Sequence, residues 1–261
     1  MAEAVVKMTR EAKTAILTIQ NPPVNVLTAQ VRDELHALVR AVAADPEIIT
    51  VIFTGAGEKA FMAGADIKSF PQMCGVYGSA YGYARTIYAV WDEIKQLPKP
   101  TIAAINGITL GAGLELALVC DLRIAEEHVK FGFPEIGLGL FPGGGGTQRM
   151  PGVCGMQLAK EMVFTGKPID SRRAMEAGLL NRVVPKGEAL NAALELAAAI
   201  NEHSGAVLAL AKRALNGGAC LPPRAGISVE AELWQDCFMT EDIKEGVQAF
   251  LEKRRPSFQN R

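Results

Sequence analysis

The feature that most constrains the fold of this chain is an alternation of buried-type strands, glycine-rich loops and helices in its middle part. Ile48–Thr54 is an apolar, β-branched stretch that Gly55-Ala56-Gly57 interrupts. Thr101–Ile105 is a second such stretch, and it passes through Asn106-Gly107 into an apolar helix that begins near Gly111. Strands separated by helices usually lie parallel in one sheet, because the chain needs a crossover to return to the same edge. The alternation therefore predicts an α/β layered fold with a largely parallel sheet.

The parts on either side of this region have different patterns. Ala4–Thr9 and Thr14–Ile19 predict a β-hairpin, and Thr28 is the expected N-cap of a helix that ends before Asp45. A loop up to Asp66 is expected next, and then a helix over about Ser79–Lys95. After Gly166 the expected elements are one strand at Asn181–Val184 and the helices Ser171–Gly178, Glu188–Glu202, Ser204–Asn216, Ser228–Cys237 and Thr240–Arg254. We therefore expect an α/β core over residues 1–190 and a helical subdomain over residues 191–261.

Composition excludes several functional classes. The chain has 27 Lys+Arg against 28 Asp+Glu, so it carries no basic surplus for nucleic acid or an anionic membrane. Its 5 cysteines, Cys220 among them, form no C-x-x-C pair, and its 3 histidines show no ligand spacing, so neither disulfides nor a metal site are expected. No apolar run approaches the length of a membrane helix. Because Glu3 follows Met1-Ala2 directly and no apolar h-region comes after Lys7, we expect no secretory signal. The scattered cysteines fit a reducing cytoplasm, which is the expected location.

Glycine is concentrated in one window of the chain. Residues 55–166 hold 19 of the 26 glycines, although neither a Gly-Lys-Ser/Thr phosphate loop nor a G-x-G-x-x-G dinucleotide motif occurs. The strand that leads into the helix near Gly111 places free N–H groups at a helix start, where small residues let a substrate oxygen approach. This arrangement suits an oxyanion hole. The alternative is that Gly111 and Gly113 only permit tight packing of the helix on the sheet.

Two carboxylates stand in apolar surroundings within the same window. Glu115 lies in the first turn of the apolar helix, and Glu135 lies in Phe131-Gly132-Phe133-Pro134-Glu135-Ile136-Gly137. A buried carboxylate is costly unless it is paired or hydrogen-bonded. The alternatives are ordinary ones, since a helix dipole favours an acid at Glu115 and Pro-Glu is a common helix start. No G-x-S-x-G motif is present, so a glycine-lined oxyanion pocket with two acids, suited to proton transfer or water activation beside a carbonyl, is the favoured reading.

At these residues the sequence resembles the enoyl-CoA hydratase/isomerase family, also called the crotonase family. The similarity runs essentially from end to end and closes with Phe250–Arg254. The matching motifs are Phe61–Lys68, Ile102–Gly107, Gly111–Ala117, Cys120-Asp121, Phe131–Leu138 and Pro142–Arg149. Together these motifs are highly specific for the family.

The resemblance implies a crotonase-like spiral of ββα units with a C-terminal helical subdomain that makes trimer contacts, two trimers stacking into a hexamer. The backbone N–H groups of Ala65 and Ala112 fall at the oxyanion-hole positions, and Glu115 and Glu135 fall at the two acid/base positions. The implied reaction is the hydration of a trans-2-enoyl-CoA in fatty-acid or aromatic-acid catabolism, with Glu135 as the proton donor to C2. This is lyase chemistry, with β-oxidation as one setting.

The resemblance also implies where coenzyme A lies. It is part of the substrate, so no separate cofactor is expected. Lys59 and Lys68 would lie near its phosphates. The expected contacts are Pro23, Val24, Ala63, Gly64, Asp66, Ile67, Lys68, Trp234 and Lys253. Trp234 and Lys253 match tail positions that reach the coenzyme A of a neighbouring subunit. The alternative is that the lysines are ordinary solvated side chains and the tryptophan only packs.

Three departures from the family pattern stand out. The segment Asn21–Asn25 is two residues shorter than usual, Ala112 replaces a common glycine, and Phe133 replaces a common amide. Two alternative functions remain open: a 3-enoyl-CoA to 2-enoyl-CoA isomerase, which does not need Glu115, and a non-catalytic RNA-binding relative. The helix that ends in Asp92–Gln96 is mixed in charge, which disfavours RNA binding.

Overall fold

The fold is built on two β-sheets in a computed structural model that describes residues 3–218 and 221–260. The expectations about a leader and about the cysteines rest partly on residues outside this range, namely Met1, Ala2 and Cys220. The larger sheet has the order β1-β2-β3-β5-β7-β10, and only its first pair, β1 with β2, is antiparallel. Its strands are β1 (Val6–Glu11), β2 (Thr14–Ile19), β3 (Thr50–Gly55), β5 (Thr101–Ile105), β7 (Leu122–Glu126) and β10 (Arg182–Val184).

A second, smaller sheet has the order β4-β6-β8-β9, in which β4, β6 and β8 are parallel and β9 is antiparallel. Its strands are β4 (Ala60–Ala63), β6 (Ile108–Leu110), β8 (Lys130–Gly132) and β9 (Ile169–Asp170). The expectation of a loop up to Asp66 was wrong, because β4 occupies part of it. Strands of two to four residues carry too few positions to show an alternating pattern, and pairing with distant strands defines them.

Helices cover both faces of the larger sheet. Ile52 and Ile102 pack with α7 (Ala189–Ile200) on one face, whereas Phe53 and Ala103 belong to the core on the other face, under α1 (Ala29–Ala44), α2 (Ser79–Gln96) and α3 (Ala112–Val119). Neighbouring residues alternate between the faces because successive strand side chains point in opposite directions. The predicted cap of the first helix is confirmed, since Thr28 Oγ1 accepts a hydrogen bond from Val31 N.

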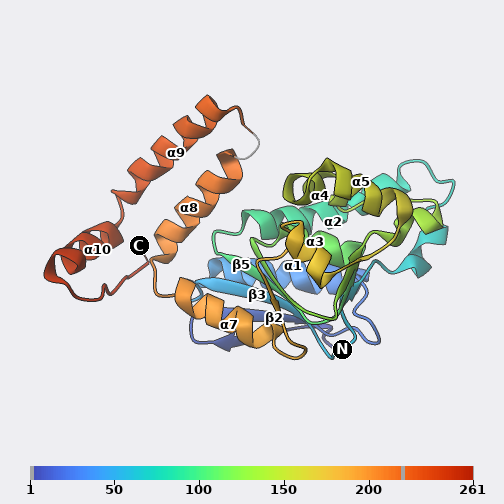
Figure 1. Ribbon diagram of the computed structural model, residues 1–261, viewed down its shortest axis with the longest axis horizontal. Coiled ribbons are helices and arrows are strands. Elements are labelled where there is room, and N and C mark those ends of the chain that lie inside the picture. Colours follow the sequence, from blue (N-terminus) through green and yellow to red (C-terminus); the bar gives the residue numbers. More distant parts are fainter. Residues whose placement is uncertain (1–2, 219–220, 261) are drawn as a thin grey trace.

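The C-terminal helices form an arm that extends away from the two sheets (Figure 1). The arm consists of α8 (Gly205–Gly218), α9 (Pro223–Cys237) and α10 (Glu241–Glu252). Because α7 packs on the large sheet, the arm begins after α7, whereas the boundary expected at residues 190/191 falls at the start of that helix. The shorter elements are η1 (Ile67–Gln72), η2 (Pro134–Leu138), α4 (Gly146–Cys154), α5 (Met156–Thr165) and α6 (Ser171–Glu176).

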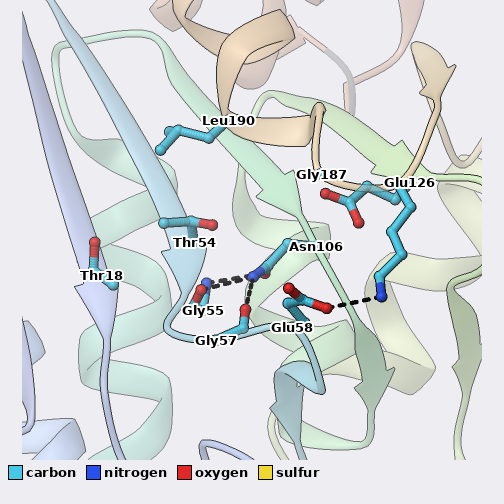
Figure 2. Close-up of a pocket in the computed structure, with 10 residues that line it drawn as sticks. Thr18, Thr54, Gly55, Gly57, Glu58, Asn106, Glu126, Gly187 and Leu190 are labelled. Carbon is cyan, nitrogen blue, oxygen red and sulfur yellow. Dashed lines mark hydrogen bonds and ion pairs between the residues drawn. The ribbon is translucent and has the colours of Figure 1, made fainter.

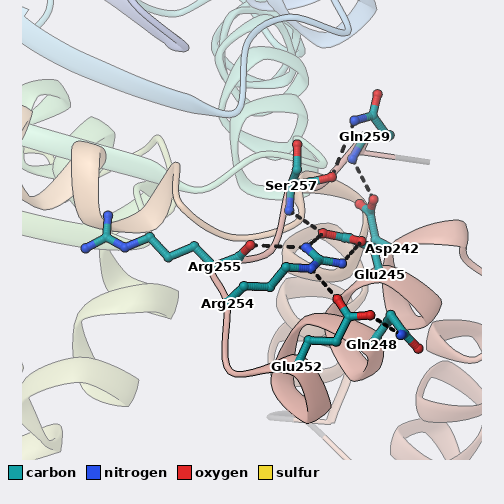
Figure 3. Close-up of polar contacts among 8 residues, drawn as sticks. All are labelled: Asp242, Glu245, Gln248, Glu252, Arg254, Arg255, Ser257 and Gln259. Carbon is teal, nitrogen blue, oxygen red and sulfur yellow. Dashed lines mark hydrogen bonds and ion pairs between the residues drawn. The ribbon is translucent and has the colours of Figure 1, made fainter.

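Polar contacts hold the arm together and attach it to the body. Lys212 of α8 is 8% exposed and pairs with Asp121, which follows α3, at 2.6 Å between Nζ and Oδ2. At the other end of the arm, Arg254 binds both carboxylate oxygens of Glu245 at 2.7 and 2.9 Å (Figure 3). The buried carboxylate of Asp242 accepts the Gln259 backbone N–H at 2.7 Å. The C-terminal segment is therefore folded back onto α10.

Two further findings concern the described residues only. The helices among them are all too short or too polar to cross a membrane. The cysteines among them, Cys74, Cys120, Cys154 and Cys237, are free thiols.

Candidate active site

The smaller sheet brings the predicted site residues to one edge. Ala63 of β4 lies opposite Leu110 of β6, and Leu110 lies opposite Gly132 of β8. Because the three strands are parallel, the residues that follow them leave the sheet on the same side. Ala65, Ala112 and Glu135 each come two or three positions after these paired residues. The carboxyl edge of parallel strands is a common place for ligand sites.

Two backbone N–H groups are available at this edge. Leu27 donates to Gly64 O at 2.8 Å and Asp66 donates to Leu27 O at 3.1 Å, so this bridge uses the residues on either side of Ala65 but not the Ala65 N–H. Ala112 is the first residue of α3, where an N–H has no partner within the helix. Gly64 and Gly111 lie side by side, since an ideal Cβ on Gly111 would be 3.5 Å from Gly64 Cα. The neighbouring N–H groups of Ala65 and Ala112 can thus serve one oxygen atom.

Glu115 lies on α3 and is held by the loop that opens α4. Its side chain is 3% exposed, and Oε1 accepts hydrogen bonds from Gly144 N at 2.7 Å and Gly146 N at 3.0 Å. Gly146 is the first residue of α4, so the positive end of that helix dipole faces the carboxylate. Burial raises the pKa of Glu115, and the two N–H donors together with Arg149 oppose this effect.

Three glycines of the run in this loop, Gly144, Gly145 and Gly146, each have a steric reason. An ideal Cβ on Gly144 would lie 2.1 Å from Glu115 Oε2, and one on Gly146 would lie 2.7 Å from the Phe133 ring. At Gly145 the added atom would be 1.8 Å from Arg149 Nη1, and φ there is +101°. The loop can approach the carboxylate this closely only because it has no side chains.

Glu135 lies in η2 and has a different environment. Its Oε2 is buried and has no hydrogen-bond partner among the residues that the structure describes, and burial, with a smaller contribution from the charge of Glu115, raises its pKa to about 7. Gly111 leaves room for the other oxygen, because an ideal Cβ there would be 2.7 Å from Glu135 Oε1. A carboxyl group with this pKa is partly protonated near neutral pH and can act as an acid.

The two carboxylates are therefore suited to different tasks. Glu115 has two N–H donors and a helix N-terminus to stabilise its charge, whereas Glu135 Oε2 has no donor. Carboxylates whose environments separate their pKa values can supply a base and an acid at the same pH. The geometry fits proton transfer next to a polarised carbonyl.

The structure brings only part of the expected coenzyme A contacts to this edge. Ala63 N donates to Val24 O at 3.1 Å, so Pro23-Val24 lies beside the end of β4. Gly64, Asp66, Ile67 and Lys68 continue from β4 at the same edge, and Ile67 and Lys68 are exposed. Trp234 and Lys253 lie on the arm, at α9 and at the end of α10, away from this edge of the chain (Figure 1).

Sequence reasoning did not identify the groups that hold Glu115. Gly144 and Gly146 were noticed as part of a glycine-rich segment but not as donors to a carboxylate, and Arg149 and Trp91 received no role. A signal was present, because a glycine run that opens a helix exposes several N–H groups. What the sequence lacks is the contact itself, which joins residues 29 and 31 positions apart.

A separate cavity lies at the carboxyl ends of the larger sheet (Figure 2). Its polar groups already have partners: the Asn106 side chain donates to the carbonyls of Gly55 and Gly57, and Lys186 pairs with Glu58 at 2.8 Å. Glu126 accepts the first N–H of α7 at 3.3 Å. The cavity contains neither Glu115 nor Glu135. In the part of the chain that the structure describes, no group of three His, Cys, Asp or Glu side chains is arranged to bind a metal ion.

Comparison with known proteins gives matches over almost the whole chain. The family described as enoyl-CoA hydratase/isomerase matches residues 9–261. A short-chain-enoyl-CoA hydratase of Clostridium acetobutylicum is 40% identical over 254 residues, 97% of each chain, and a crotonyl-CoA hydratase of Syntrophomonas wolfei is 39% identical over 259 residues, 99% of each chain. The crystal structure of enoyl-CoA hydratase from Bacillus anthracis superimposes with a TM-score of 0.93 at 35% identity, covering 98% of this chain and 100% of that one. The predicted crotonase-like α/β fold with C-terminal helices is confirmed.

Proposed function

The chain belongs to the enoyl-CoA hydratase/isomerase family, and we propose that it adds water across the 2,3 double bond of a trans-2-enoyl-CoA to give a 3-hydroxyacyl-CoA. The observation that carries this proposal is the pair of carboxylates, the buried Glu115 and the half-buried Glu135, beside two available backbone N–H groups. This is hydro-lyase chemistry, and water and the thioester are its only reactants. No separate cofactor takes part.

In the proposed reaction the N–H groups of Ala65 and Ala112 bind the thioester oxygen. Attack of water on C3 moves negative charge onto this oxygen, so donors fixed at that point stabilise the transition state more than the ground state. One such donor is typically worth about 2.7–4 kcal/mol. Because the donors belong to the backbone at the ends of β4 and β6, they do not need to reorganise when the charge develops.

Glu115 and Glu135 hold the water and manage its protons. The water oxygen forms the bond to C3, its proton passes to Glu115, and the proton of Glu135 is transferred to C2, so one H₂O is added overall. The raised pKa of Glu135, about 7, supports its role as the donor. The N–H groups of Gly144 and Gly146 support the carboxylate form of Glu115 as the base.

Hydration of crotonyl-CoA, followed by the loss of the conjugated thioester absorbance, tests this function. We expect Glu115→Gln and Glu135→Gln each to lower kcat by about 10²- to 10⁴-fold, the usual contribution of general acid–base catalysis. An isomerase that moves a 3,4 double bond to the 2,3 position needs only one acid/base. A Glu115→Gln variant that hydrates crotonyl-CoA at the wild-type rate would contradict the hydratase assignment and favour isomerisation.

Glu126→Gln is the matched control for these variants. Glu126 is also 3% exposed and also accepts a backbone N–H, from Ala189, but it lies at the other cavity. The control therefore removes an equally buried charge without touching the proposed site. We expect its kcat to equal that of the wild type at a temperature where both are folded.

We also propose a short-chain substrate and the coenzyme A contacts named above. The relatives from C. acetobutylicum and S. wolfei are named for short-chain and crotonyl substrates, which supports crotonyl-CoA as a substrate here. Two large buried side chains, Trp91 and Phe133, lie against the loop whose N–H groups hold Glu115. Comparison of kcat/KM for crotonyl-CoA and a ten-carbon enoyl-CoA tests this preference. We place the reaction in the cytoplasm and in the β-oxidation of fatty acids.

We further propose that the arm joins copies of this chain into a trimer, and that two trimers form a hexamer. Large apolar side chains on the arm are exposed in the single chain, including Leu215 at 76%, Trp234 at 64% and Phe250 at 82%. Contact with another copy would cover them and bring Trp234 and Lys253 to a neighbour's coenzyme A. Light scattering of the wild type and of Phe250→Asp tests this, with a monomeric wild type contradicting the proposal.

A further inference from the structure

We propose that Arg149 is a positioning residue for Glu115: it fixes the Gly144–Gly145 peptide so that the N–H groups on either side of it converge on Glu115 Oε1. The proposal rests on the hydratase function and adds a residue to which that function gave no role. Arg149 touches neither Glu115 nor the proposed substrate contacts by hydrogen bonding. It acts through the backbone of the loop.

The contacts of Arg149 explain this placement. Its Nη1 donates to Gly144 O at 3.0 Å, and its Nη2 pairs with Asp92 Oδ1 of α2 at 2.8 Å. The Gly144 carbonyl belongs to the peptide that lies between the two N–H donors, those of Gly144 and Gly146. The guanidinium plane therefore links α2 to the middle of the loop, and the planar, rigid fork of arginine suits such a two-pronged contact.

The loop needs an external support because it has no side chains of its own. Gly144, Gly145 and Gly146 are all buried, and glycine has more accessible backbone conformations than any other residue. If the central peptide were not fixed, rotation of the glycine backbone would allow the two N–H groups to point in different directions. Arg149 is only 22% exposed in its side chain, and its hydrogen bond to Gly144 O is partly buried, so solvent screens this contact less than it screens a surface arginine.

The positive charge of Arg149 has a second effect on Glu115. Together with the two N–H donors it favours the carboxylate form, against the burial that raises the pKa of Glu115. Removal of Arg149 must therefore raise this pKa. As the pH is lowered, Glu115 is then protonated, and stops acting as a base, at a higher pH than in the wild type. A purely structural residue would not have this signature.

The test compares Arg149→Met with the wild type in crotonyl-CoA hydration over pH 5–9. We expect kcat to fall about 10- to 100-fold, the range for losing charge-assisted hydrogen bonds, with KM nearly unchanged. We also expect the acid limb of the pH profile of kcat/KM to move to higher pH. Arg149→Lys keeps the charge without the fork, and should show a smaller shift of the limb with most of the loss in kcat.

Arg32→Met is the matched control. Arg32 is 19% exposed in its side chain, pairs with a neighbouring aspartate, Asp33, and donates to Thr86 of α2 at 2.9 Å, so it links α1 to α2 as Arg149 links α4 to α2. We expect wild-type kcat and an unmoved acid limb in this variant. The positioning role is overturned if Arg149→Met retains wild-type kcat. It is also overturned if the acid limb does not move and the loss of activity only parallels a fall in melting temperature.

A fluorescence readout separates this proposal from the proposed function. The chain has 2 tryptophans, and in Trp234→Phe only Trp91 remains, whose Nε1 lies 3.1 Å from the position of an ideal Cβ on Gly144. Ionisation of Glu115 should change its emission, and Arg149→Met in this background should raise the midpoint of that titration. If the wild type fails to hydrate crotonyl-CoA, the proposed function is rejected, but the shift of the fluorescence midpoint caused by Arg149→Met still tests the role of Arg149. An unmoved midpoint would reject the role of Arg149 alone.

Discussion

Replacement of Glu135 by glutamine should stabilise the protein at alkaline pH while it removes activity. In the folded protein the pKa of Glu135 is raised to about 7, from an ordinary value of 4.5, mainly by burial. In the unfolded chain the same carboxyl group ionises near its ordinary value. The folded state therefore holds this proton more tightly, and the free energy of unfolding falls as pH rises from about 4.5 to about 7. Above that range the full cost of a buried charge is present.

The size of this cost follows from the pKa difference. A change of one in pKa corresponds to about 1.36 kcal/mol, so the upper limit is about 3 kcal/mol, and solvent screening of a partly exposed side chain reduces it to about 1–3 kcal/mol. Glu135→Gln has no charge to bury. We compare the free energy of unfolding of the variant with that of the wild type at each pH. This difference should favour the variant by about 1–3 kcal/mol more at pH 8 than at pH 5.

Urea unfolding at one protein concentration, at pH 5 and pH 8, measures this difference. Glu245→Gln is a control of opposite sign, because the Arg254 guanidinium lowers the pKa of Glu245 to about 2. Such a carboxylate stabilises the fold above its unfolded pKa, so this variant should be less stable than the wild type at both pH values. If Glu135→Gln and the wild type differ by the same amount at pH 5 and pH 8, Glu135 ionises as an ordinary glutamate and the reasoning about its acid role is refuted.

Three other variants test the fold. Lys212→Met leaves the Asp121 carboxylate without its buried partner, and we expect a loss of about 3 kcal/mol in urea unfolding, near the lower end of the cost of breaking a buried pair. Gly113→Ala would place a Cβ 1.9 Å from Met62 O, so β4 must move, and we expect a loss of at least about 2 kcal/mol in the same assay. Thr28→Ala removes an N-cap, and a melting experiment should show a loss of about 1 kcal/mol. Wild-type stability in any of these variants would contradict the contact concerned.

Elements with a strong local pattern could be predicted from the sequence. The second strand of the middle region was expected at Thr101–Ile105 and is found there, and the first helix begins after its expected cap, Thr28. Ser228 was expected to begin a helix that in fact begins at Pro223, because proline fits the first turn of a helix although it suggests a break in a sequence pattern. The smaller sheet was missed, since its short strands are defined by partners about 20 to 50 residues away.

The candidate site was accessible to sequence reasoning only in part. Glu115 and Glu135 were selected because each is an acid in apolar surroundings, which is a local property. Their different environments are not local, because they depend on whether a loop about 30 residues away turns its N–H groups toward the side chain. The alternative reading of Gly113, that it only permits close packing, agrees with its contact with β4. At the start of α3, Gly113 therefore permits close packing on β4, and Gly111 leaves room for the Glu135 carboxyl group.

The arrangement of helix starts accounts for how the proposed site divides its charges. The first N–H of α3, that of Ala112, is directed to the thioester oxygen in the proposed reaction, and the first N–H of α4, that of Gly146, is directed to Glu115. Both positions carry negative charge during hydration, so each meets the positive end of a helix dipole. Among the described residues Glu135 Oε2 meets no donor, and burial keeps the proton on this carboxyl group to higher pH. A donor placed near Glu135 should therefore convert the acid into a second base, lowering its pKa and the rate of protonation at C2 together.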